Sequence, residues 1–107
     1  MEFEWDENKR EENLRRDEGG TPRGIDFVDA IPLFADARSL AVEDTRKAYG
    51  ERRFNLYGYA ADGNLYMVTF TRRSHRIRII SARRANQREK RRYEQEKERK
   101  ADPGPAD

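Results

Sequence analysis

Arg76-Ile77-Arg78-Ile79-Ile80-Ser81-Ala82-Arg83-Arg84 is the stretch of sequence that decides the fold. Its first residues alternate between charged and apolar, which is the two-residue period of a strand buried on one face. Arg76 and Arg78 should therefore share one face of the strand, and the intervening isoleucines should share the other. From Ser81 onward the pattern becomes charged and helical as far as Tyr93. The stretch predicts a strand that leads into a basic helix, an arrangement suited to holding phosphate.

Two more strands are expected just upstream. Arg52–Tyr59 is rich in aromatic residues and is followed by the turn signal Asp62-Gly63-Asn64, after which Leu65–Thr71 forms the partner strand. With His75–Ser81 as the third strand, these segments predict an antiparallel meander. Two shorter segments could extend the sheet: Met1–Trp5 and Ser39–Val42.

Three segments are expected to be helical. Asp6 can cap a polar helix over Glu7–Arg16, and Asp26 can cap a second helix. The second helix carries one apolar stripe: Phe27, Ala30, Ile31 and Phe34. Pro32 should kink or end it near Ile31, because proline has no N–H and its ring clashes with the preceding turn.

The third expected helix is Arg84–Lys100, and four of its arginines should share one face: Arg84, Arg88, Arg91 and Arg92. These elements predict an α+β fold, with a small antiparallel sheet, N-terminal helices and a C-terminal basic helix. We expect a single domain over residues 1–100 and a disordered tail over 101–107. A loop rich in glycine is expected over residues 17–24.

The charge of the chain is unevenly distributed. The net charge is only +2, but residues 1–71 carry ten Lys/Arg against fifteen Asp/Glu, and residues 72–100 carry thirteen Lys/Arg against four Glu. A basic C-terminal third indicates an anionic partner, which could be a nucleic acid, an acidic protein or a membrane surface.

Several classes of protein are disfavoured by the composition. The 107 residues contain no cysteine, which excludes disulfides and cysteine-based zinc sites. There is no run of about 18 apolar residues that would suggest a membrane span, and the first residues do not resemble a signal peptide. No metal-ligand spacing and no glycine-rich phosphate loop is present. We therefore expect an intracellular protein without metal, cofactor or membrane attachment.

The arginine cluster is the strongest candidate site. Guanidinium groups are always charged, bind phosphate through two hydrogen bonds, and stabilise the added negative charge of a phosphoryl transition state. The alternative is a solvated, salt-bridged helix that serves only solubility. Arginine does not accept protons, so other groups are needed for acid–base chemistry: Lys9, Glu89 and Tyr93. Tyr93 could instead dock its helix onto the domain, and Glu89 could orient an arginine or be a helix-surface residue.

Three segments, in order along the chain, resemble the BrnT family. The first is Phe3-Glu4-Trp5-Asp6 with Lys9 and Asn13, and the second is Gly24-Ile25-Asp26-Phe27 followed by Asp29-Ala30. The third is residues 76–83, followed by Ala85, Glu89 and Tyr93. Together they cover roughly residues 2–94.

The resemblance implies a toxin of a type II toxin–antitoxin pair with a RelE-like fold. Such a toxin would be a metal-independent ribonuclease that acts in the bacterial cytoplasm. A BrnA antitoxin with a ribbon-helix-helix DNA-binding domain would neutralise it, so that the toxin contacts DNA only through its partner.

The resemblance and the arginine pattern together suggest roles for individual residues. The RNA 2′-hydroxyl would attack the adjacent phosphorus while Arg78 and Arg83 stabilise the transition state. Lys9, Glu89 or Tyr93 would transfer protons. The arginines expected to bind RNA are Arg76, Arg84, Arg88 and Arg92.

Two departures from the family pattern leave other functions open. Family members often have Lys-His-Gly where this sequence reads Pro22-Arg23-Gly24, and the connection from Asn13 to Phe27 is longer than usual. The only histidine, His75, is expected to be an exposed residue at a strand end. The alternatives are a non-catalytic nucleic-acid-binding module and an inactive homologue that acts as a corepressor with the antitoxin.

Overall fold

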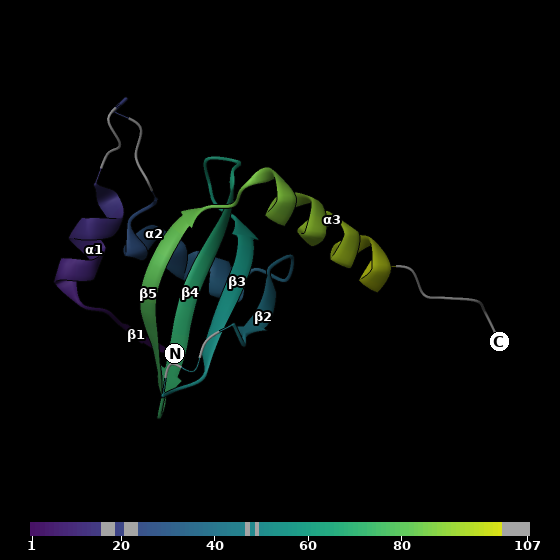
Figure 1. The fold of residues 1–107 in the computed structure, drawn as a ribbon. Helices are drawn as coiled ribbons and strands as arrows, with labels where there is room; N and C mark the ends of the chain where they lie inside the picture. The colour runs from purple at the N-terminus through teal and green to yellow at the C-terminus, as the bar shows by residue number, and fades with distance from the viewer. Residues whose placement is uncertain (16–18, 21–23, 47, 49, 102–107) are drawn as a thin grey trace.

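The computed structural model describes residues 1–15, 19–20, 24–46, 48 and 50–101. Its five strands form one sheet in the order β1-β5-β4-β3-β2 (Figure 1). The elements, in chain order, are β1 (Glu2–Glu4), α1 (Glu7–Leu14), α2 (Phe27–Ala30), the 3-10 helix η1 (Ile31–Ala35), β2 (Leu40–Asp44), β3 (Arg53–Tyr59), β4 (Leu65–Arg73), β5 (Arg76–Arg84) and α3 (Gln87–Ala101). The predicted α+β class, the meander and both extensions of the sheet are confirmed.

The sheet is mixed, so the prediction of a purely antiparallel sheet is wrong at one edge. β1 pairs with β5 in parallel, with Phe3 opposite Ile77, whereas the other neighbouring strands are antiparallel. Residues 5–75, about two thirds of the chain, separate these two strands. No hairpin therefore fixes their relative direction, and a parallel pairing is open to them.

The boundary between β5 and α3 lies later than predicted. β5 continues to Arg84, which pairs with Tyr66 of β4, and α3 begins only at Gln87. Arg84 is therefore a strand residue and does not share a helical face with the arginines of α3. The N-terminal helix α1 is shorter than predicted, because it ends at Leu14.

Parts of the prediction fall outside the described residues. Arg16, the predicted end of the first helix, is not among the described residues, and neither is most of the loop predicted over residues 17–24. Of the tail predicted over residues 101–107, the described part is Ala101, the last residue of α3.

A β-bulge in β5 reverses the alternation of its side chains. Phe70 of β4 faces Ile79, but the preceding residue Thr69 faces Ser81, so Ile80 is an extra residue. Before the bulge, Ile79 is buried in the core, and after it the core residue is Ala82, with 0% exposure. The bulge therefore turns Arg83 onto the face opposite the core. The predicted faces of Arg76–Ile79 are confirmed.

The hydrophobic core lies on one face of the sheet, beneath α2 and η1. In Figure 1 these two helices lie behind the sheet, and the opposite face, which we call the open face, is turned to the viewer. Phe34 of η1 packs edge-on against Phe3 and Phe70, with ring centroids 5.2 and 4.9 Å apart. The core residues include Phe27, Ala30, Leu33, Leu56, Val68, Phe70, Ile77, Ile79 and Ala82. Pro32 lies in the first turn of η1, and the α-helix ends before it, as predicted.

The side chain of Asn13 attaches α1 to the edge of β5. Its Nδ2 donates to the carbonyl oxygens of Ile25 (2.9 Å) and Ala82 (2.7 Å), and its Oδ1 accepts from the Ala82 N–H at 2.9 Å. The backbone at Gly24 approaches so closely that a Cβ there would lie 1.9 Å from the Ala82 oxygen. Asn13 and Gly24 together therefore hold three segments at one point.

We predict that Asn13→Ala lowers the free energy of unfolding by about 1 to 3 kcal/mol, because it leaves partly buried backbone groups unpaired. Urea denaturation would measure the change. Asn8→Ala, on the exposed side of the same helix, is the matched control and should change stability by less than about 0.5 kcal/mol. Equal stability of the two variants would contradict the attachment role of Asn13.

Candidate functional site

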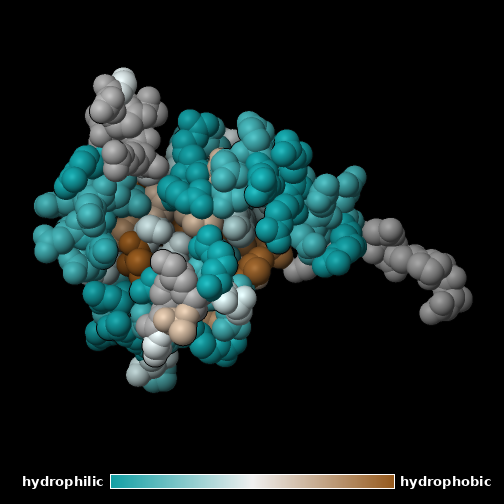
Figure 2. Space-filling view, viewed as in Figure 1, coloured by the Kyte–Doolittle hydropathy of each residue, from teal (hydrophilic) through white to brown (hydrophobic). Residues whose placement is uncertain are grey.

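A cavity of about 470 Å³ lies on the open face, between the sheet and the first turns of α3. Its floor includes Asn55, Tyr57 and Met67, and its cationic residues are Arg46, Arg83, Arg88 and Arg92. Figure 2 shows hydrophilic side chains around most of this face and less polar atoms between them over the sheet. We call this space the α3 cavity. In the part of the chain that the structure describes, no helix is long and apolar enough to cross a membrane.

Arg83 and Glu89 form a two-point ion pair in the α3 cavity. The Nη1 and Nη2 atoms of Arg83 each donate to one carboxylate oxygen of Glu89, both at 2.8 Å. Hydrogen bonding from Arg83 lowers the pKa of Glu89, and the same contact raises the pKa of Arg83. Both groups are therefore charged at neutral pH, and the guanidinium plane is held in one orientation.

Glu89 also fixes the start of α3. The Asn86 N–H donates to Glu89 Oε1 at 2.9 Å, and the Glu89 N–H donates to Asn86 Oδ1 at 2.8 Å, which is a capping box. Both carboxylate oxygens of Glu89 are thus already hydrogen-bonded. This geometry favours the arginine-orienting role that the sequence suggested for Glu89 over the proton-transfer role.

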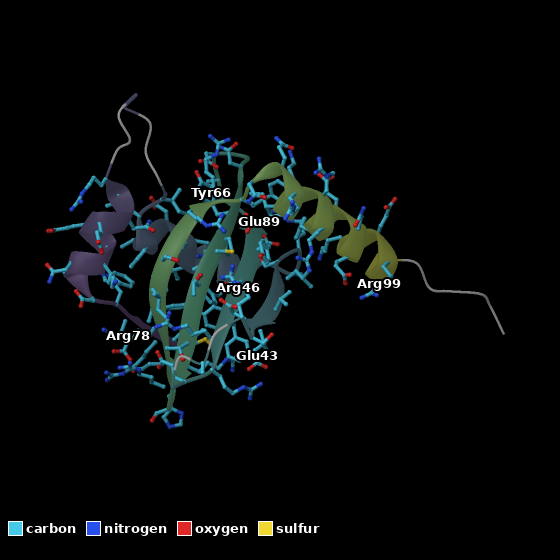
Figure 3. All side chains as sticks on the ribbon, viewed as in Figure 1. Glu43, Arg46, Tyr66, Arg78, Glu89 and Arg99 are labelled. Carbon is cyan, nitrogen blue, oxygen red and sulfur yellow. The ribbon has the colours of Figure 1, made fainter. Side chains whose placement is uncertain are left out.

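Arg46 is a cationic residue of the cavity that the sequence did not single out. Its Nε and Nη2 atoms both lie 2.9 Å from carboxylate oxygens of Asp44, and its backbone N–H donates to the same group at 3.1 Å. The Asp44 side chain is 3% exposed, whereas that of Arg46 is 74% exposed. The buried carboxylate therefore anchors a guanidinium that reaches into solvent. Figure 3 shows Arg46 and Glu89 over the same open face.

Arg88 and Arg92 lie on α3 at the rim of the α3 cavity. They are four residues apart, so they project from the same side of the helix. Within the described residues, neither forms an ion pair. These two guanidinium groups are available to an anionic ligand.

Tyr93 docks α3 onto the domain, as the structural alternative for this residue predicted. It is 6% exposed, its hydroxyl donates to the carbonyl oxygen of Arg38 at 2.5 Å, and its ring packs edge-on against Tyr59. Burial raises the pKa of its hydroxyl. Tyr93 lines the α3 cavity, but its hydroxyl group already donates its hydrogen to a backbone carbonyl oxygen.

Four predicted site residues do not line the α3 cavity. Lys9 lies on α1, 3.9 Å from Glu12, and Arg78 pairs with Glu4 at 3.1 Å, toward the β1 edge (Figure 3). The others are Arg76, which pairs with Glu2 at 3.0 Å, and Arg84, which donates to Asn64 at 2.9 Å. The structure thus brings together Arg83, Glu89, Tyr93, Arg88 and Arg92. His75 is exposed at the turn between β4 and β5.

The fold and the site define a small α+β protein with an arginine-lined cavity for an anionic ligand. The family model described as "Ribonuclease toxin, BrnT, of type II toxin-antitoxin system" matches residues 5–89, so the chain belongs to the BrnT toxin family. It is therefore a ribonuclease toxin, whose system implies RNA as substrate and an antitoxin as partner.

A solved structure supports the same assignment. The chain is similar to the Brucella abortus ribonuclease toxin BrnT, with 28% sequence identity and a TM-score of 0.57. The match covers 81% of this chain and 99% of the other. A comparison with curated proteins gave no match. The family resemblance inferred from three short segments is confirmed.

We predict that Glu89→Gln lowers stability at pH 7 and that the difference from the wild type shrinks in acid. The folded-state pKa of Glu89 lies below its ordinary value of 4.5, so the ion pair stabilises fully above that value. The stabilisation is lost as the pH falls through the lowered pKa. Thermal unfolding at a series of pH values from neutral into acid would measure the difference.

Glu94→Gln is the matched control, since it removes the same charge from an exposed position on α3. Its difference from the wild type should be smaller at pH 7. A Glu89→Gln difference that stayed constant from neutral pH into acid would contradict a stabilising Arg83–Glu89 pair.

Proposed function

We propose that the α3 cavity is where this toxin cleaves RNA, without a metal ion, and that the cleavage inhibits translation and growth. The observation that carries the proposal is the convergence of Arg46, Arg83, Arg88 and Arg92 on one cavity from three separate segments. Several guanidinium groups around one space can hold a phosphodiester and its neighbouring phosphates.

The proposed reaction is transesterification within the RNA. The 2′-hydroxyl oxygen bonds to the adjacent phosphorus and the bond from phosphorus to the 5′-oxygen breaks, giving a cyclic 2′,3′-phosphate and a 5′-hydroxyl. Arg83, held by Glu89, stabilises the extra negative charge on the phosphoryl oxygens. Arg88 and Arg92 bind the flanking phosphates. Catalytic roles for Lys9 and Arg78, and RNA binding by Arg76 and Arg84, stay predictions that the cavity geometry does not favour.

The acidic residues support a reaction without metal. Within the described residues, no three His, Cys, Asp or Glu side chains are grouped closely enough to hold a metal ion. Each of the four acids that line the cavity is paired with a guanidinium group: Asp44 with Arg46, Glu89 with Arg83, Glu43 with Arg52 and Glu96 with Arg99.

We predict that Arg83→Ala lowers kcat for RNA cleavage by about 100- to 1000-fold, the usual effect of removing one donor to a transition-state oxyanion. The assay is cleavage of a labelled RNA by purified toxin in excess EDTA, which should not slow the wild type. Arg91→Ala, on α3 but outside the cavity lining, is the matched control and should retain wild-type activity. Unimpaired cleavage by Arg83→Ala would remove Arg83 from the proposed mechanism.

We further propose that the partner is a BrnA-like antitoxin with a ribbon-helix-helix domain, and that it covers the rim of the α3 cavity in the bacterial cytoplasm. The toxin then reaches DNA only through this antitoxin. The basic rim formed by Arg88 and Arg92 supports the choice of surface, because it offers charge to an acidic segment. The relation to RelE toxins, implied by the family resemblance, also stays a prediction.

We predict that expression of the toxin alone arrests growth and yields RNA fragments, and that co-expression with its antitoxin restores growth. Arg88→Glu together with Arg92→Glu should weaken antitoxin binding in a pull-down assay, while the exposed Arg91→Glu should not. Salt-sensitive RNA binding without cleavage would instead support the non-catalytic module. Antitoxin binding with no growth arrest would support the inactive corepressor.

A further inference from the structure

Asn55 presents a hydrogen-bond donor at the floor of the α3 cavity that no described residue uses. Asn55 lies on β3, is 8% exposed and lines the cavity. The hydroxyl of Thr69, opposite it on β4, donates to Asn55 Oδ1 at 2.9 Å. The Nδ2 group of Asn55 has no partner among the described residues. Buried polar groups are nearly always paired, so an unpaired donor that faces a cavity indicates a ligand.

Thr69 binds the Asn55 amide through its oxygen. A hydroxyl can donate to an amide oxygen or accept from an amide nitrogen, so the direction of this bond decides which amide atom stays unpaired. In this structure the Thr69 hydroxyl donates to Oδ1, which leaves Nδ2 without a partner among the described residues. The floor therefore offers a hydrogen-bond donor.

The surroundings of Asn55 suit a flat, partly apolar ligand. Val42 of β2 is its cross-strand neighbour on the other side, and Tyr57 lies two residues along β3 on the same face. Leu40 and Met67 lie on either side of Tyr57 in the sheet, and all of these residues line the cavity. An aromatic ring, apolar walls and one aimed amide are what proteins use to hold an unstacked nucleobase.

We propose that Asn55 reads the base of the nucleotide next to the cleaved phosphate, with Thr69 as its positioning residue. The Nδ2 group donates to O4 of uracil or O6 of guanine, the oxygens that stand where cytosine and adenine carry an amino group, so the site takes the keto bases uracil and guanine in preference to the amino bases. The arginines at the rim hold the phosphates of the same nucleotide. This inference rests on the proposed function, because it assigns substrate selectivity to the same cavity.

The test is the cleavage pattern on an RNA that contains all dinucleotide steps, with the fragment ends mapped by sequencing. Wild-type toxin should cut beside keto bases roughly tenfold more often than beside amino bases, the scale of one good base contact. Asn55→Asp replaces the donor with an acceptor and should reverse the preference. Thr69→Val frees the amide to turn and should bring the ratio close to one.

Ser81→Ala is the matched control. Ser81 faces Thr69 from β5 in the same row of the open face, but it does not line the cavity. This variant should keep the wild-type ratio. The inference is overturned if Asn55→Asp and Thr69→Val also keep it, and in that case RNA cleavage by the wild type still supports the proposed function.

If the wild-type toxin does not cleave RNA, a binding measurement tests whether Asn55 recognises the base. The Asn55 side-chain amide signal in NMR spectra is followed during titration with UMP, GMP, CMP and AMP, with the unliganded Thr69→Val variant used for assignment. A shift with UMP and GMP that is larger than with CMP and AMP supports base recognition by Asn55 even though the proposed cleavage has failed. Absence of any shift, or equal shifts with all four, overturns the inference.

Discussion

The extra residue at Ile80 decides which face of the sheet carries Arg83. A strand without a bulge would place Arg83 on the same side as Ile77 and Ile79, in the core, because side chains alternate strictly. The bulge shifts the alternation by one residue, so Ala82 fills the core and the arginine turns to the open face. The bulge thus keeps the charge of Arg83 out of the core and places it in the α3 cavity.

The placement of Arg83 in turn determines how α3 is held. Arg83 binds Glu89, and Glu89 caps the helix with Asn86, so the strand, the connection and the helix start form one hydrogen-bonded unit. Further along, Tyr93 ties the helix to the carbonyl oxygen of Arg38. With two attachments a turn apart, α3 keeps a fixed position above the sheet. Figure 1 shows its later turns extending away from the sheet.

Local patterns in the sequence predicted the main features of the fold. They did not predict the features that depend on how strands pair with one another. The alternation over Arg76–Ile79 correctly assigned both faces, but the bulge then breaks the period, which made residues 82–84 resemble the start of a helix. The strand β1 was predicted, but its parallel direction had no local signal, since its partner β5 lies far from it in the chain. One missed signal was present: Asn86 followed three residues later by Glu89 is a capping-box pattern.

The residues of the candidate site also fall into two groups, those that the sequence could identify and those that required the structure. Arg83, Arg88, Arg92, Glu89 and Tyr93 are close together in the chain, so the family resemblance and the charge pattern could find them. Asn55 and Arg46 reach the cavity only through the order of strands in the sheet, and no spacing in the sequence relates them to Arg83. Residues from the middle of the chain therefore required the structure.

The cavity also constrains the proton chemistry of the proposed reaction. Glu89 is held ionised with both oxygens occupied, and the Tyr93 hydroxyl is donated to the backbone. Among the described lining residues, Tyr57 is the titratable neutral group whose hydroxyl has no partner, and burial raises its pKa. A phenol with a raised pKa stays protonated at neutral pH, so it can donate a proton to the departing 5′-oxygen but cannot accept one from the 2′-hydroxyl. Without histidine in the cavity, the proposed rate enhancement must come mainly from the fixed charges of the arginines and from donation to the leaving group rather than from a strong base.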